Sequence, residues 1–292
     1  MKMSAPAVAV LCLVFAGCRL VSPPHGPVDP ALAVFVPPDT VALLGVQMNL
    51  LRQAPLYRKL AQQGRLSMLD GFRAETGIDP DRDVRQLLLA GDGRHALALA
   101  RGTFKPNPPD GWHASDYRGC TLWAKENGVA VAFPDNSTAI GGPDALVRAA
   151  IDRRKDGRPA APADLLARAA AVPSDIEIWA VVAGWSKVPP GTLSGNLANL
   201  DRVLRSVDGA GLTVTFSAGV NAAATGDCRT AQEAAELTES LRGLAGLARL
   251  GVPRDRPELA RVFDGMRITQ EDRHVKWSLD IPPDLADTLA TK

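Results

Sequence analysis

The sequence predicts an α+β fold in which antiparallel sheets have helices packed on one face, and it leaves open an arrangement as two related α+β units. Three observations support this class. Short apolar segments follow one another across turn residues, as at 85–104, which is typical of hairpins. An amphipathic segment at 143–154 follows such a run of strands. A Val-Pro-x-Asp sequence precedes an apolar segment at 36–39 and again at 172–175.

The N-terminal residues 1–18 predict export and a lipid anchor. Lys2 precedes an apolar run at 5–16, which is shorter than the roughly 20 residues of a bilayer-spanning helix and is typical of a signal peptide. The sequence Phe15-Ala16-Gly17-Cys18 resembles the lipobox of bacterial lipoproteins. The resemblance implies cleavage between Gly17 and Cys18 and a diacylglyceryl group on the Cys18 thiol. The alternative is an ordinary signal-peptide site beside an incidental cysteine.

The chain is expected to continue from this anchor as a tether and two folded units. The predicted segments are a signal peptide at 1–17, a Pro-rich tether at 18–33, a first α+β unit at 34–154, a linker with a short helix at 155–171 and a second α+β unit at 172–292. The prolines of the tether favour an extended conformation, which would hold a folded body away from a membrane surface.

Strands and helices follow from the spacing of apolar residues between turn residues. The predicted strands are 41–48, 85–91, 95–104, 119–126, 128–135, 137–142, 172–184, 211–219, 220–227, 266–272 and 274–282. The predicted helices are 56–77 with a break near Gly64, 143–154, 165–172, 196–207, 230–251, 257–265 and 282–290. Thr230 and Glu233 form a capping box at the start of one of them. Residues 105–118 are predicted to be a loop.

The two Val-Pro-x-Asp sequences each lead into a strand and then a helix. Duplication of one α+β unit explains this pattern. A common strand-entry turn that arose twice explains it as well, because the later elements of the two halves do not keep one spacing.

Composition excludes a nucleic-acid partner, because a net charge of +1 offers no basic surface. The four cysteines are reduced to two in the predicted mature body, since Cys12 lies in the signal peptide and Cys18 carries the lipid. In an oxidising compartment Cys120 and Cys228 are free to form a disulfide. The alternative is that each is a small buried residue.

No motif predicts a catalytic residue, a metal site or a cofactor. The histidines are scattered and lack the spacing of zinc ligands. Residues 79–83 have the opening spacing of a calcium loop, but Val84 and Ala90 stand where glycine and glutamate are required.

Aromatic residues in two long loops are the candidates for partner binding. Trp112 and Tyr117 lie in the loop 105–118, and Trp185 lies in a loop at 183–196. Exposed aromatics in such loops can anchor a glycan or a protein. The alternative is that each ring folds back over the edge of the core.

Most of the region 34–285 is similar to a family of uncharacterised bacterial secreted lipoproteins. The residues that carry the resemblance are PLYRKL (55–60), GRHALALARGTF (93–104), AIGGPDALVRAAIDRR (139–154) and RVFDGMRITQEDRHVKWSLDIP (261–282). The resemblance implies no known activity. We therefore expect a non-enzymatic module of the cell envelope that binds or scaffolds a protein or glycan. The alternative is an envelope hydrolase whose acid residues converge only in three dimensions.

The predicted lipid anchor also sets the expected location. It attaches the chain to a membrane, with the body in the periplasm or at the cell surface. Arg19, which follows the lipidated cysteine, favours the outer membrane.

Overall fold

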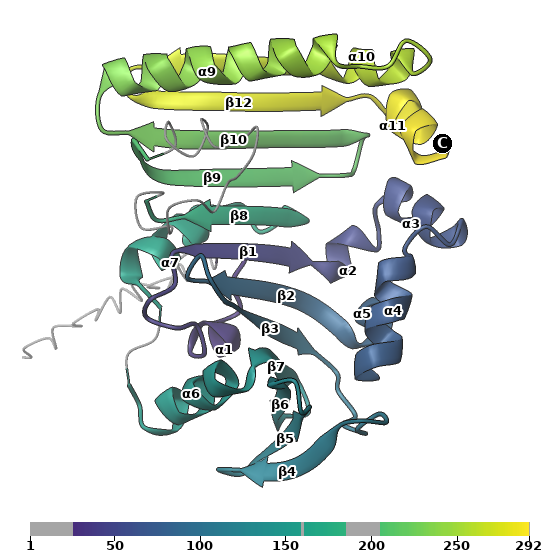
Figure 1. The fold of residues 1–292 in the computed structure, drawn as a ribbon, viewed down its shortest axis with the longest axis vertical. Coiled ribbons are helices and arrows are strands. Elements are labelled where there is room, and N and C mark those ends of the chain that lie inside the picture. The colour runs from purple at the N-terminus through teal and green to yellow at the C-terminus, as the bar shows by residue number, and fades with distance from the viewer. Residues whose placement is uncertain (1–25, 159–160, 185–204, 292) are drawn as a thin grey trace, which may run out of the picture.

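The computed structural model describes residues 26–158, 161–184 and 205–291. The strands are β1 (Ala42–Gln47), β2 (Val84–Gly91), β3 (Ala96–Gly102), β4 (His113–Tyr117), β5 (Cys120–Ala124), β6 (Val129–Asp135), β7 (Thr138–Pro143), β8 (Ile178–Val182), β9 (Val207–Thr215), β10 (Val220–Cys228), β11 (Met266–Glu271) and β12 (His274–Ile281). They form one sheet in the order β11-β12-β10-β9-β8-β1-β2-β3-β7-β6-β5-β4 (Figure 1). Neighbouring strands are antiparallel, which confirms the α+β class, but one sheet replaces the several that were predicted.

Helices lie between and after these strands. They are α1 (Pro30–Ala33), α2 (Met48–Leu51), α3 (Pro55–Gln62), α4 (Ser67–Thr76), α5 (Pro80–Asp83), α6 (Asp144–Lys155), α7 (Ala163–Ala170), α9 (Ala231–Leu250), α10 (Pro257–Asp264) and α11 (Pro283–Thr291). The predicted break near Gly64 is confirmed, because Gly64 has a φ of +66° between α3 and α4. The capping box of Thr230 and Glu233 at the start of α9 is also confirmed. Among the described residues, no helix is long and apolar enough to cross a bilayer.

The two Val-Pro-x-Asp sequences precede β1 and β8, and these strands are antiparallel neighbours in the centre of the sheet (Figure 1). From this pair the sheet continues outwards as β1-β2-β3-β7-β6 on one side and as β8-β9-β10-β12-β11 on the other. α6 follows β7, as α11 follows β12. This order is what a duplicated unit would give, although both halves share one sheet. The duplication itself stays a prediction.

Helices cover both faces of the sheet, whereas helices on one face only were predicted. Ile140 of β7 packs in a core cluster with Val147 and Ile151 of α6. The preceding residue, Ala139, points to the opposite face and packs in a second cluster with Met48 of α2. The central strands are apolar on both faces, so each face needs cover. A third, smaller cluster lies under α9 at the β10–β12 end.

One local prediction was wrong, and another falls mostly outside the described residues. The predicted loop 105–118 contains β4, which joins β5 through a turn with positive φ at Arg118 (52°) and Gly119 (78°). Such φ values are required by the two-residue hairpin turns that match the twist of antiparallel strands. The predicted helix 196–207 lies mostly outside the described residues, and its last residue, Val207, begins β9.

Candidate functional site: an apolar groove beside α4

The structure places the predicted aromatic anchors in the protein and not on its surface. Trp112 is only 8% exposed, its Nε1 donates to the carbonyl of Glu75 at 2.9 Å, and its ring packs edge-on against Trp123. Tyr117 is half-buried, and its hydroxyl lies 3.0 Å from a carboxylate oxygen of Asp152. Both rings therefore cover the edge of the core. Trp185, Gly17 and Cys18 lie outside the described residues.

Cys120 and Cys228 are both free and buried. Cys120 is in β5 and Cys228 in β10, and seven strands (β6, β7, β3, β2, β1, β8 and β9) separate them in the sheet. Neighbouring strands lie about 4.8 Å apart, whereas the Cα atoms of a disulfide lie within about 7 Å. Of the two alternatives that the sequence left open, the disulfide does not form, and each cysteine is a small buried residue of its own core cluster.

An open apolar groove of about 540 Å³ lies between α4 and one face of β2, β3, β7 and β6. Its floor comes from alternate residues of these strands, which are Leu87, Leu89, Ala96, Ala98, Ala100, Val129, Val131, Ala139 and Gly141. The strand register aligns Leu89, Ala98, Gly141 and Val131 in one row across the four strands. Since the middle of this row is alanine and glycine, the floor has free volume above it.

Helix α4 forms the wall of the groove with Leu69, Phe72 and Thr76. Phe72 is 45% exposed although it is aromatic, because it lines the open side. The Thr76 hydroxyl donates to the carbonyl of Phe72 at 2.7 Å and so presents no free donor to the groove. The bond from Trp112 to the carbonyl of Glu75 ties α4 to the end of the groove. The wall is thus apolar and held at its C-terminal turn.

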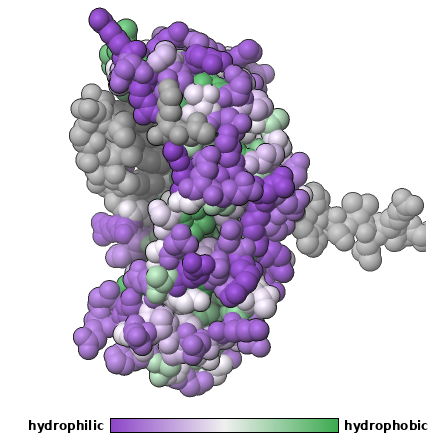
Figure 2. All heavy atoms as spheres, turned by 90° about the vertical axis from the view of Figure 1, so that its right-hand side faces the viewer, coloured by the Kyte–Doolittle hydropathy of each residue, from purple (hydrophilic) through white to green (hydrophobic). Residues whose placement is uncertain are grey.

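The groove is a local feature and not part of a broad apolar surface. Viewed from the side that carries α3, α4, α5 and α11, the molecule is mainly hydrophilic, with small separate apolar areas (Figure 2). Part of the groove floor remains accessible: Val129 is 39% exposed and Ala98 is partly exposed, whereas Ala100, Val131 and Ala139 are buried. A concave site lined mainly by apolar side chains is the usual form of a small-molecule binding site.

A second cavity, here called the polar pocket, adjoins the groove and has a volume of about 500 Å³. Ile78 and Phe104 line both cavities. The polar pocket also contains Arg82, Asp83 and Lys105. The Arg82 Nε donates to an oxygen of Asp83 at 3.0 Å. One cation is therefore neutralised by the carboxylate, while the exposed Lys105 adds a second positive charge.

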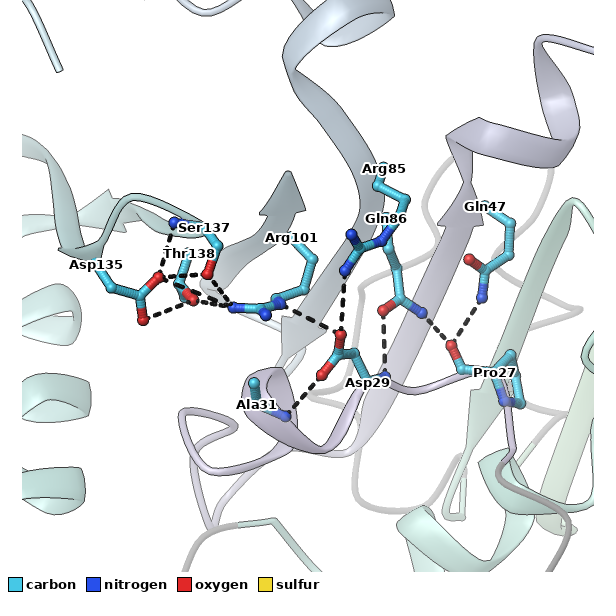
Figure 3. A network of polar contacts seen from close by, with 10 residues as sticks. All are labelled: Pro27, Asp29, Ala31, Gln47, Arg85, Gln86, Arg101, Asp135, Ser137 and Thr138. Carbon is cyan, nitrogen blue, oxygen red and sulfur yellow. Dashed lines mark hydrogen bonds and ion pairs between the residues drawn. The ribbon is translucent and has the colours of Figure 1, made fainter. Parts of the chain in front are cut away.

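The described end of the predicted tether 18–33 belongs to the folded body, which corrects the prediction that the body begins at residue 34: Leu32 of α1 is fully buried, and the segment is fixed on the face opposite the groove. Gln86 of β2 donates to the carbonyl of Pro27 and accepts from the amide of Asp29 (Figure 3). Gln47 donates to the same Pro27 carbonyl at 2.8 Å, and the Arg101 guanidinium lies 3.2 Å from an oxygen of Asp29 (Figure 3). Gln86 shares its face with Leu88 and not with Leu87 or Leu89 of the groove floor, since side chains alternate along a strand.

The structure offers little to the hydrolase alternative. Among the described residues, no cluster of three or more histidines, cysteines and acids is arranged to hold a metal. His274 lies 2.9 Å from Asp227, but the same carboxylate also accepts from Arg168 at 2.7 Å, so the trio joins α7 to β10 and β12. Glu75 is the sole ionisable residue in the lining described for the groove, which leaves no acid–base pair there.

No known family model matches this chain. No curated protein matches it either. Two solved crystal forms of TP0453 have a similar fold over most of the chain. Form I has a TM-score of 0.47 at 10% identity and covers 90% of this chain and 98% of TP0453. Form III has a TM-score of 0.49 at 8% identity, with coverage of 91% and 99%.

The groove was not predicted from the sequence. The strands that form its floor were correctly predicted, but their alternate residues look like ordinary core positions. The one local signal is the run of small residues at Ala96, Ala98, Ala100 and Gly141, which fill little of the space above a sheet. Whether a helix covers such a face depends on where residues 48–83 fold against the sheet. The apolar pattern of the strands carries no information on this.

Proposed function

We propose that this chain is a lipid-anchored, non-catalytic binding protein of the bacterial cell envelope, and that the groove beside α4 holds a hydrophobic ligand. The apolar groove of about 540 Å³ carries the proposal, because it falls in the range of about 300–1,000 Å³ found for small-molecule sites. Its lining supplies shape and apolar contact but no catalytic pair. The anchor rests on Cys18 and the lipobox resemblance.

The position of the N-terminal segment supports separate places for the anchor and for the proposed ligand site. Pro27 and Asp29 are bound to the face opposite the groove, so the described part of the N-terminal segment does not occupy the groove. Gly26 packs against Ala170 of α7, where a Cβ would lie 2.4 Å from the Ala170 Cα. This contact fixes residue 26 against α7.

The anchor is tested by metabolic labelling with radioactive palmitate in cells that express the full chain. We expect label on the wild-type protein and none on Cys18→Ser. Label that persists on Cys18→Ser would exclude the lipobox assignment.

The groove is tested separately with N-phenyl-1-naphthylamine, a neutral dye that fluoresces in apolar sites. We expect saturable binding to the full chain carrying Cys18→Ser, and loss of binding when Ala98→Phe fills the floor. The matched control is Ala223→Phe, which places the same ring at an exposed position of β10. Equal dye binding by the Ala98 and Ala223 variants, both folded, would contradict the groove as the binding site.

A further inference from the structure

The groove limits the chemistry of its ligand through its hydrogen-bonding groups. The backbone groups of β2, β3, β7 and β6 pair with one another across the floor. The Thr76 hydroxyl is occupied by the Phe72 carbonyl. A peptide backbone or a sugar laid on this floor would therefore bury amides or hydroxyls without partners, at a cost of about 1–3 kcal/mol for each group. A hydrocarbon chain carries no such groups.

Small residues in the middle of the floor and aliphatic or aromatic residues around it suit a narrow flexible chain. Ala98 and Gly141 are cross-strand partners, with Leu89 and Val131 on either side. Phe72 of α4 lines the same space. A hydrocarbon chain gains about 0.8 kcal/mol for each methylene transferred from water.

The polar pocket supplies a place for a head group. It shares Ile78 and Phe104 with the groove, and Lys105 directly follows Phe104, so a chain that runs along β3 towards Phe104 ends next to it. Its ionisable residues are two cations, Arg82 and Lys105, and one anion, Asp83. Asp83 accepts from Arg82 and from the backbone amide of Asp79, whereas Lys105 is exposed at the rim. The pocket therefore has an excess of positive charge and complements a single anion.

We propose that the groove and the polar pocket together bind one free long-chain fatty acid, with the hydrocarbon chain running along β3 from Ala98 past Ala100 towards Phe104 and the carboxylate beside Lys105. This inference rests on the proposed function and names its ligand. The lipid predicted on Cys18 is a less suitable occupant, because Pro27 is held on the opposite face of the sheet.

The test measures displacement of N-phenyl-1-naphthylamine by palmitate from the full chain carrying Cys18→Ser, which lacks a lipid of its own. We expect palmitate to displace the dye, and each methylene removed from the fatty acid to weaken binding by up to about fourfold. Lys105→Gln should weaken palmitate about tenfold and leave the uncharged hexadecanol unchanged.

Lys125→Gln is the matched control, because Lys125 lies at the Trp112 end of the groove, 3.0 Å from Glu75 and 4.7 Å from the Trp112 ring centroid. It should bind palmitate as the parent does. If Lys125→Gln weakens palmitate and Lys105→Gln does not, the assignment of the carboxylate to the polar pocket is wrong. If the dye binds in an Ala98-dependent way and palmitate does not displace it, the proposed function stands and the fatty acid is excluded.

Discussion

Gly45 of β1 lies directly opposite Trp179 of β8, and the indole occupies the space that a side chain at Gly45 would need. A Cβ at Gly45 would lie 2.2 Å from the ring. Trp179 is fully buried and packs in the large core cluster under α6 and α7. The two strands that follow the Val-Pro-x-Asp sequences are thus joined by a close contact of backbone and ring at the centre of the sheet.

Gly45→Ala should therefore destabilise the protein. The added methyl must displace the indole within a packed core, which typically costs about 1–3 kcal/mol. Urea unfolding followed by circular dichroism should show a lower midpoint with an unchanged slope.

Gly243→Ala is the matched control for that substitution. Gly243 lies in α9, and nothing lies within 4 Å of the position of its added Cβ. Alanine in a helix interior is favoured over glycine by about 0.5–1 kcal/mol, so this variant should be more stable than the parent. Equal midpoints for the two variants would contradict the close contact at Gly45.

This contact shows how far the sequence predicts the fold. Both strands were predicted from their apolar residues, and the repeated Val-Pro-x-Asp sequence left open whether they come from a duplicated unit or share a common strand-entry turn. Their pairing was not predicted, because β1 and β8 lie far apart in the chain and strand patterns carry no information on distant partners. The choice between a disulfide and free thiols at Cys120 and Cys228 could not be made from the sequence for the same reason, because it depends on the strand order, which places the two cysteines far apart in the sheet.

The groove and β4 were missed for different physical reasons. β4 is an edge strand whose residues His113–Asp116 are exposed, so it has no apolar alternation to detect. The groove floor has such alternation, and what distinguishes it is the incomplete cover by α4. The sequence left open whether Trp112 is a surface anchor or folds back over the edge of the core, and the structure has it folded back. It does line the groove, but it does so as a buried ring that holds α4.

Gln86→Leu should release the N-terminal segment from the sheet. Gln86 is buried and bonds both the Pro27 carbonyl and the Asp29 amide, and leucine can replace neither bond (Figure 3). Unpaired groups of this kind cost about 1–3 kcal/mol. Hydrogen exchange at residues 29–33 should accelerate, while exchange in α9 should not change. Gln53→Leu is the control, since Gln53 is exposed and bonds only within its own helical turn. Unaltered exchange at 29–33 in Gln86→Leu would show that this contact does not hold the segment.

Cys120 and Cys228 should resist alkylation in the folded protein. Burial raises the pKa of both thiols, so little thiolate is present near neutral pH. Iodoacetamide at pH 8 should label neither residue in native protein and both in urea without reductant, as read by peptide mass spectrometry. Failure to label them in urea until a reductant is added would indicate a disulfide and contradict the strand order.

The contact of Asp227 with Arg168 and His274 should contribute a pH-dependent part of the stability. Burial opposes ionisation of Asp227, but hydrogen bonds from Arg168 and His274 outweigh it, so the pKa of this carboxyl is lowered. A lowered pKa in the folded state stabilises the protein above the usual carboxyl value of about 3.9, and this contribution is lost as the pH falls through the lowered pKa. Because the side chains are about one-third exposed, we expect only about 0.5–1 kcal/mol.

Asp227→Asn should accordingly be less stable than the parent in urea at pH 6, and the difference should shrink as the pH is lowered towards 2. Asp255→Asn is the control for the loss of one carboxylate, because Asp255 is exposed in the turn between α9 and α10. Arg168 also lies over Gly209, where a Cβ would come within 2.0 Å of the guanidinium carbon. Gly209→Ala should therefore displace Arg168 and reproduce part of the Asp227→Asn pH profile, although it removes no charge. A Gly209→Ala variant with the parent's pH profile would show that Arg168 does not need this position to stabilise Asp227.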